Sequence, residues 1–121
     1  MLQFEVKASG GPPAGFYRTR FITVEPTQHE EFGAGLKFVF EVTEGELKGQ
    51  QASRITSSSP TPKNAAGRIV SGIIGEPLVA GQRIDLAPFV GREYLTQVET
   101  VPGGTSTRIA TVMPAWNRGA V

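Results

Sequence analysis

The chain has 121 residues, with 12 Lys and Arg, 11 Asp and Glu, one histidine and no cysteine. A chain of this length is expected to form one domain with a core that needs no disulfide. The lack of cysteine excludes disulfides, cysteine-based zinc sites and a cysteine nucleophile, and the single His29 excludes a multi-histidine metal site. A formal net charge of +1 provides no long-range attraction for nucleic acid, so local clustering of cations would have to supply it.

The sequence also bears on cellular location. No stretch approaches the roughly 18 apolar residues that a membrane-spanning helix needs. The start, Met1-Leu-Gln-Phe-Glu, lacks the basic region and the apolar run of a signal peptide. We therefore expect a cytoplasmic protein without a membrane partner, and the lack of cysteine agrees with a reducing compartment.

The 15 glycines and 9 prolines indicate short elements joined by many turns, as in an all-β domain. Residues 1–15 end in a Gly/Pro cluster and are expected to form an arm or an edge strand. A strand is predicted over 16–24, where the apolar character changes face near Phe21 and Ile22. Such a change is typical of a long, bent strand that serves two parts of a barrel. A polar loop is expected over 26–35.

The range 36–43 has the most regular alternation in the chain. Its two faces are expected to be Leu36, Phe38, Phe40 and Val42 toward the core, and Lys37, Val39 and Glu41 toward water. A tight connection at 44–46 contains glycine and leads back into a more polar strand over 47–56. Gly49 lies inside that strand and is expected to mark a bulge or a close approach.

A short helix is predicted after the third strand. Thr61 is the expected N-cap, with Pro62 at the first helical position, and apolar residues then recur with a helical period. Gly75 stands where a C-terminal glycine is favoured. Gly67 and Gly72 each cost an isolated helix roughly 1 kcal/mol, so we expect the rest of the domain to hold this helix in place.

A connector over 76–91 leads to two final strands, over 92–100 and 105–113. Three strands, a helix and two more strands follow the order of an OB-type barrel, in which the helix plugs one end. We therefore predict a mostly β domain over residues 16–114, a five-stranded Greek-key barrel of the OB type with one short helix between its third and fourth strands. Residues 115–121 are expected to form a short C-terminal tail.

No catalytic constellation stands out in the sequence. Gly33-Ala-Gly35 precedes a strand, whereas a dinucleotide-binding loop follows a strand and opens a helix. The serines at 57–59 lie in a loop before the helix, and the only histidine, His29, belongs to a different polar loop. We expect neither an enzyme nor a bound metal or small-molecule cofactor.

The remaining functional signal is the placement of cations and aromatic residues. Proteins that bind single strands combine a basic groove for the backbone with aromatic faces for the bases. An OB barrel uses the face around its second and third strands, with the loops between strands one and two and between four and five. The residues expected on this surface are Tyr17, Arg18, Arg20, Phe32, Lys37, Lys48, Arg54, Arg92, Tyr94, Arg108 and Trp116.

These candidates have neighbours and alternatives. Lys63 and Arg68 lie near the same surface in sequence order, and Phe21 is another candidate for base stacking. For each residue, the ordinary alternative is a water-facing cation or a core aromatic. The functional interpretation therefore depends on whether the fold gathers them.

Three segments resemble small phage-type single-stranded-DNA-binding proteins. Gly15-Phe-Tyr-Arg-Thr-Arg-Phe-Ile-Thr-Val-Glu25 is similar to their opening strand. Gly35-Leu-Lys-Phe-Val-Phe-Glu-Val-Thr43, with the glycines that follow it, is similar to their second strand and hairpin. Phe89-Val-Gly-Arg-Glu-Tyr94 resembles the entry to their fourth strand. The resemblance covers roughly residues 15–114 and implies an OB fold, single-stranded DNA as the ligand, and a role in replication or recombination.

Two functions remain open at this point. The leading hypothesis is sequence-tolerant binding of single-stranded nucleic acid, without turnover. The alternative is a protein-interaction or assembly module of a phage or bacterial complex, in which the strand over 47–56 and the apolar N-terminal segment pair between subunits of a homo-oligomer. The final residues, 116–121, contain no acidic side chain, which argues against the recruitment of partners by an acidic tail that such DNA-binding proteins often use.

Overall fold

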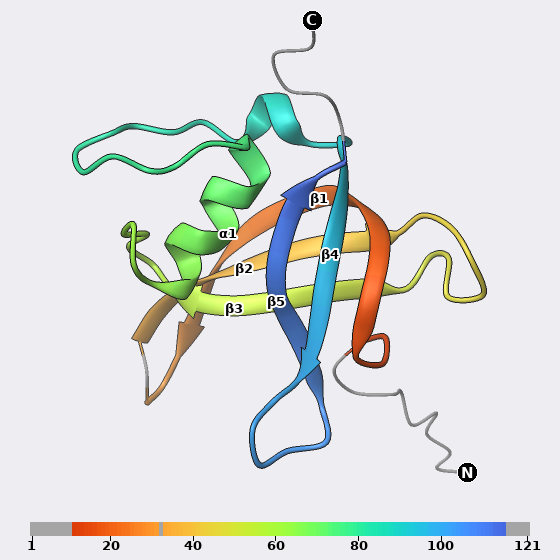
Figure 1. Cartoon of the computed structure of the whole chain (residues 1–121). Coiled ribbons are helices and arrows are strands. Elements are labelled where there is room, and N and C mark those ends of the chain that lie inside the picture. Colours follow the sequence, from red (N-terminus) through yellow and green to blue (C-terminus); the bar gives the residue numbers. More distant parts are fainter. Residues whose placement is uncertain (1–10, 32, 116–121) are drawn as a thin grey trace, which may run out of the picture.

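The computed structural model describes residues 11–31 and 33–115, which form one antiparallel five-stranded sheet, one α-helix and one short 3₁₀ helix. The strand order across the sheet is β3-β2-β1-β4-β5 (Figure 1). The elements are β1 (Gly15–His29), β2 (Gly33–Val42), β3 (Gln51–Ser57), α1 (Ala65–Ile74), η1 (Ala87–Phe89), β4 (Glu93–Thr100) and β5 (Thr107–Pro114). No helix in these two ranges is long and apolar enough to cross a membrane.

The long strand β1 organises the sheet by pairing with two partners. Residues 15–20 pair with β4, and residues 19–29 pair with β2. The register with β2 shifts between Phe21 and Thr23, and such an irregularity lets a strand bend from one partner to the next. The predicted change of face at this point is confirmed. The strand is longer than predicted, because much of the expected loop over 26–35 pairs as strand.

The two end strands of the sheet, β3 and β5, face one another across a gap that we call the seam. No β-ladder joins them within the described residues. The curvature of the sheet nevertheless brings them close, since Arg54 Nη1 on β3 donates a 2.9 Å hydrogen bond to the Ile109 carbonyl on β5. The helix α1 packs against both strands (Figure 1). The mostly β architecture with five antiparallel strands and one α-helix is confirmed, whereas the sheet is not closed into the predicted barrel.

The start of the helix differs from the prediction. Asn64, not Thr61, is the N-cap of α1, and its Oδ1 accepts a 2.8 Å hydrogen bond from the Gly67 amide. Thr61 instead opens the preceding turn, where its Oγ1 accepts from the Lys63 and Asn64 amides at 3.4 and 3.3 Å. Both residue types are favoured N-caps, and Asn is favoured somewhat more than Thr, which agrees with the observed cap. The C-terminal glycine is confirmed, because Gly75 is left-handed with a φ of 78°.

The two glycines inside α1 allow it to pack closely on its neighbours. A Cβ at Gly67 would lie 1.6 Å from the Thr61 carbonyl oxygen, and a Cβ at Gly72 would lie 2.2 Å from the Val112 carbonyl oxygen of β5. Neither position has room for a side chain. Both glycines have a low helix propensity, but they allow α1 to lie in close contact with the preceding turn and with β5.

The core between α1 and the inner face of the sheet centres on three aromatic rings. The ring centres of Phe21 and Phe40 are 5.3 Å apart, and Phe40 meets Tyr94 edge to face at 5.7 Å. The Tyr94 hydroxyl donates a 2.6 Å hydrogen bond to the Ile73 carbonyl, which ties the helix to β4. The predicted inward face of the second strand is confirmed and consists of Leu36, Phe38, Phe40 and Val42.

Two predictions about β2 and β3 are wrong. Gly49 does not lie inside a strand, because β3 begins only at Gln51, and Gly49 has a φ of 94° in the loop that joins the two strands. This left-handed conformation is typical of glycine in turns. Val39 was expected to face water but is only 6 % exposed. The reason is that β2 lies between two neighbours, whose Thr23 and Ser53 stand opposite Val39.

Candidate nucleic-acid interface

Arg18 and Arg20 lie on the outer face of β1, in alternation with inward-facing residues of the strand. Each has a glutamate of its own on a neighbouring strand. Arg18 Nε donates a 2.8 Å hydrogen bond to Glu93 Oε2 on β4, and Arg20 Nη2 donates a 2.9 Å bond to Glu41 Oε1 on β2. We call these two ion pairs the β1 pairs. Their positive charges are balanced one to one.

Arginines from the two end strands meet at the seam. Arg54 of β3 reaches toward β5, and its Nη1 lies 3.6 Å from Glu99 Oε2 of β4. The same oxygen accepts a 2.8 Å hydrogen bond from Arg108 Nε on β5. Arg68 of α1 is near enough for its charge to act on Arg54. Two guanidinium groups thus contact one carboxylate, and the charge of a third acts on Arg54. We call Arg54, Arg68, Arg108 and Glu99 the seam cluster.

The seam cluster carries more positive than negative charge. The Arg54 side chain is only 12 % exposed. Desolvation by burial lowers the pKa of Arg54 below its ordinary value, the charges of Arg108 and Arg68 lower it further, and Glu99 opposes them. Two positive charges therefore remain after the single carboxylate is counted. A bound anion would reduce the repulsion among the three guanidinium groups.

The other predicted cations lie in separate places. Lys37 is on the outer face of β2, opposite Ile55 of β3. Lys48 is exposed in the loop between β2 and β3. Arg92 immediately precedes β4, and its guanidinium carbon lies 4.8 Å from the centre of the Phe89 ring. The fold therefore brings Arg54 and Arg108 together, with Arg68, and leaves the remaining predicted cations in several regions.

The predicted stacking residues require a correction. Tyr94 is 0 % exposed, because its ring belongs to the aromatic core and its hydroxyl is bonded to α1, so it offers no face to a base. Phe21 is likewise fully buried. Tyr17 is half-buried, and its hydroxyl donates a 2.6 Å hydrogen bond to the backbone carbonyl four residues earlier. Phe32 and Trp116 lie outside the described residues.

Phe16 is the exposed aromatic residue that the sequence analysis missed. Its side chain is 74 % exposed, and it shares the outer face of β1 with Arg18. Leu95 of β4 stands opposite Arg18, and Met113 of β5 stands opposite Leu95, so all lie on one face of the sheet. Leu95 and Met113 are also exposed, and we call Phe16, Leu95 and Met113 the outer apolar patch. Its signal in the sequence was the alternation of Phe16 with residues that face the core.

The seam cluster is suited to bind anions. Arginine presents a planar fork of donors that matches the oxygens of phosphate, and grouped guanidinium groups favour such a ligand. In the described ranges, no group of three or more His, Asp or Glu side chains could hold a metal ion. The chain matches no protein-family model, no curated protein and no solved structure.

Proposed function

We propose that the protein binds single-stranded nucleic acid, with DNA as the expected form, and that its curved sheet is an open OB-type barrel. The observation that carries the proposal is the seam cluster, where Arg54 and Arg108 share one glutamate and the charge of Arg68 also acts on Arg54. Because the whole chain carries a formal charge of only +1, an uncompensated local cluster is the source of attraction for phosphate. The strand order and the position of α1 between β3 and β4 support the OB-type assignment. The corresponding biological role is in DNA replication or recombination.

Bases are expected to contact Phe16. This residue stands opposite Gln97 of β4, and Arg108 stands opposite Glu99, two residues further along the same face of β4. Since β1 and β5 are two strand spacings apart, roughly 10 Å, one short oligonucleotide can reach both. Stacking of a base on an exposed aromatic ring contributes about 1–3 kcal/mol.

Fluorescence anisotropy with a labelled oligothymidine tests this function. Saturable binding at low salt is expected, with a logarithmic salt slope of about −0.7 for each phosphate contacted. A duplex of the same length is expected to bind more weakly, because its paired bases are not available to Phe16. No binding of oligothymidine at low salt would contradict the proposal.

The outer apolar patch favours a second candidate function, a protein-interaction or assembly module. Exposed apolar patches on one face of a domain are typical of interaction sites. This patch borders the Arg18–Glu93 pair, which carries one charge of each sign, so a second copy related by a two-fold axis would present complementary charges. A salt-insensitive oligomer that Leu95→Asp dissociates, together with no affinity for oligothymidine, would favour this function over the first.

A further inference from the structure

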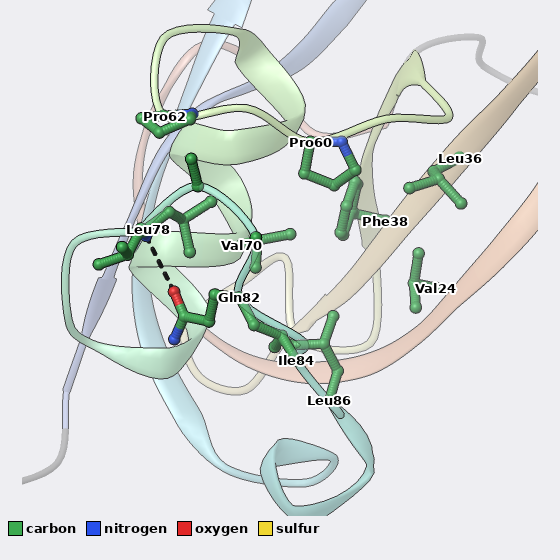
Figure 2. Close-up of a pocket in the computed structure, with 13 residues that line it drawn as sticks. Val24, Leu36, Phe38, Pro60, Pro62, Val70, Leu78, Gln82, Ile84 and Leu86 are labelled. Carbon is green, nitrogen blue, oxygen red and sulfur yellow. Dashed lines mark hydrogen bonds between the residues drawn. The ribbon is translucent and has the colours of Figure 1, made fainter.

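A pocket of about 340 Å³ lies between α1, the loop that follows it, and parts of β1 and β2 (Figure 2). The buried side chains of Phe38 and Val70 lie at its base, so the pocket reaches the core of the domain. Its walls are apolar side chains from both strands and the loop: Val24, Leu36, Leu78, Ile84 and Leu86. None of the seam cluster residues lines it in the described structure.

The loop beside the pocket is held by a turn that satisfies its own hydrogen bonds. The backbone N–H of Gln82 donates to the Val79 carbonyl at 3.0 Å. The backbone N–H of Val79 donates to the side-chain oxygen Oε1 of Gln82 at 2.9 Å (Figure 2). Gly81 supplies the left-handed residue of this turn, with a φ of 84°. The hydrogen bonds that hold this turn lie within the loop itself, so this wall of the pocket forms without a ligand.

The lining offers very little polar chemistry. Gln82 is the only described lining residue with a hydrogen-bonding side chain, and no described lining residue is charged. Its Oε1 is already used in the turn, which leaves its Nε2 amide as the available donor. A charged group would lose its hydration in the pocket without a compensating partner.

We propose that this pocket binds a small, uncharged, hydrocarbon-rich molecule that carries at most one polar group. The volume lies near the lower limit of ligand pockets, roughly 300–1,000 Å³, so the ligand is smaller than a nucleotide cofactor. Hydrophobic contact with the side chains of α1, β1 and β2 supplies the affinity. This site is independent of the proposed binding of nucleic acid.

The test uses octan-1-ol as the probe, followed by methyl NMR of the full chain. Saturable shifts are expected for the methyl groups of Val24, Leu36, Val70 and Leu86. The matched probe is 1,8-octanediol, whose second hydroxyl would be buried without a partner and which is expected to bind about tenfold more weakly or worse. If neither probe shifts these methyl groups up to its solubility limit, or if both bind equally, the proposal is wrong.

A blocked pocket supplies the second arm. Ala80→Trp places a large ring on a lining position, and Val79→Trp does so at a second exposed lining position, in case the first variant disturbs the turn. Both are expected to abolish the octanol shifts. The control is Val90→Trp, an equally large change at an exposed residue outside the lining, which should bind like the parent. Unchanged octanol binding by folded Ala80→Trp and Val79→Trp proteins would overturn the proposal.

Discussion

Two groups of arginines on the same sheet differ in how their charge is balanced. In the β1 pairs, Arg18 and Arg20 each have a separate glutamate. In the seam cluster, Arg54 and Arg108 share Glu99, and the positive charge of Arg68 also acts on Arg54. The number of arginines on a surface therefore does not identify an anion site. We expect the ratio of arginines to carboxylates within reach to be the better guide.

The difference follows from the position of each strand in the sheet. β1 lies in the middle, so an outward arginine on it has a register neighbour on both sides, and Arg20 stands opposite both Glu41 and Glu93. β3 and β5 are end strands with one ladder neighbour each. Arg54 stands opposite Phe38, which supplies no charge, and its side chain turns to the seam instead. The excess positive charge therefore lies at the end strands β3 and β5, which have a ladder partner on one side only.

Arg54→Ala is expected to have the largest effect on stability. It removes a largely buried guanidinium and leaves the Ile109 carbonyl without its hydrogen bond, at a cost of about 2 kcal/mol in the free energy of unfolding. The control, Arg20→Ala, removes an exposed pair and is expected to cost about 0.5 kcal/mol. Urea unfolding of both variants measures the contrast. Equal losses would show that the seam hydrogen bond adds nothing beyond a surface pair.

The double variant Arg68→Ala/Arg108→Ala is expected to have the next largest effect, on affinity. Loss of two phosphate contacts should weaken oligothymidine binding by roughly 10- to 30-fold at low salt. Arg18→Ala/Arg20→Ala removes the same formal charge from the β1 pairs and is expected to weaken binding less than threefold. Anisotropy titrations compare the two. A greater loss of affinity in Arg18→Ala/Arg20→Ala would indicate that the binding surface is the outer face of β1.

Glu99→Gln is expected to raise the affinity for oligothymidine, whereas the arginine variants lower it. Removal of the shared carboxylate leaves Arg54 and Arg108 without their counter-charge, so affinity for oligothymidine should rise about fivefold, through stronger local attraction. The matched change at a β1 pair, Glu93→Gln, is expected to raise affinity less than twofold. The same titrations measure both variants. A fall in affinity for Glu99→Gln would mean that Glu99 positions Arg108 for the ligand.

The smallest expected effect is that of pH. Burial and the neighbouring arginines lower the pKa of Arg54, which disfavours its charged form in the fold, and that cost disappears only above the lowered pKa. Arginine remains charged throughout the range from about pH 6 to about pH 9. The affinity for oligothymidine, and the folding equilibrium constant contributed by the β1 pairs or by the seam cluster, should therefore change less than twofold across this range. Anisotropy and urea unfolding at several pH values check this. A rise in affinity toward acid would indicate that a histidine or a carboxylate takes part.

The alternation of apolar residues was sufficient to predict the sheet. It located the inward face of β2 and the change of face at the middle of β1, which the register shift near Phe21 explains. The end of β1 was missed, because polar residues pair as readily as apolar ones when a partner strand lies beside them. The open edge between β3 and β5 was outside the reach of local patterns, because the described end strands share no ladder and meet instead through side chains such as Arg54.

The candidate site was predictable in part. Arg54 and Arg108 were expected on the binding surface, and the fold does bring them together. Their shared partner Glu99 was not expected, because the pairing of β4 with β5 determines it. Tyr94 was expected to be exposed but is buried, and the exposed Phe16 was not named as a candidate. The strand face decides burial, and only the alternation along the strand, not the aromatic side chain itself, indicates that face.

The most direct measurement is the salt dependence of oligothymidine affinity for the parent protein and the two double arginine variants. If the seam cluster holds the phosphates, Arg68→Ala/Arg108→Ala should reduce the steepness of the logarithmic salt slope by about 1.4, from two lost contacts. Arg18→Ala/Arg20→Ala should leave the slope close to that of the parent. Identical slopes for the parent and the seam variant, or a parent that does not bind at low salt, would contradict the account.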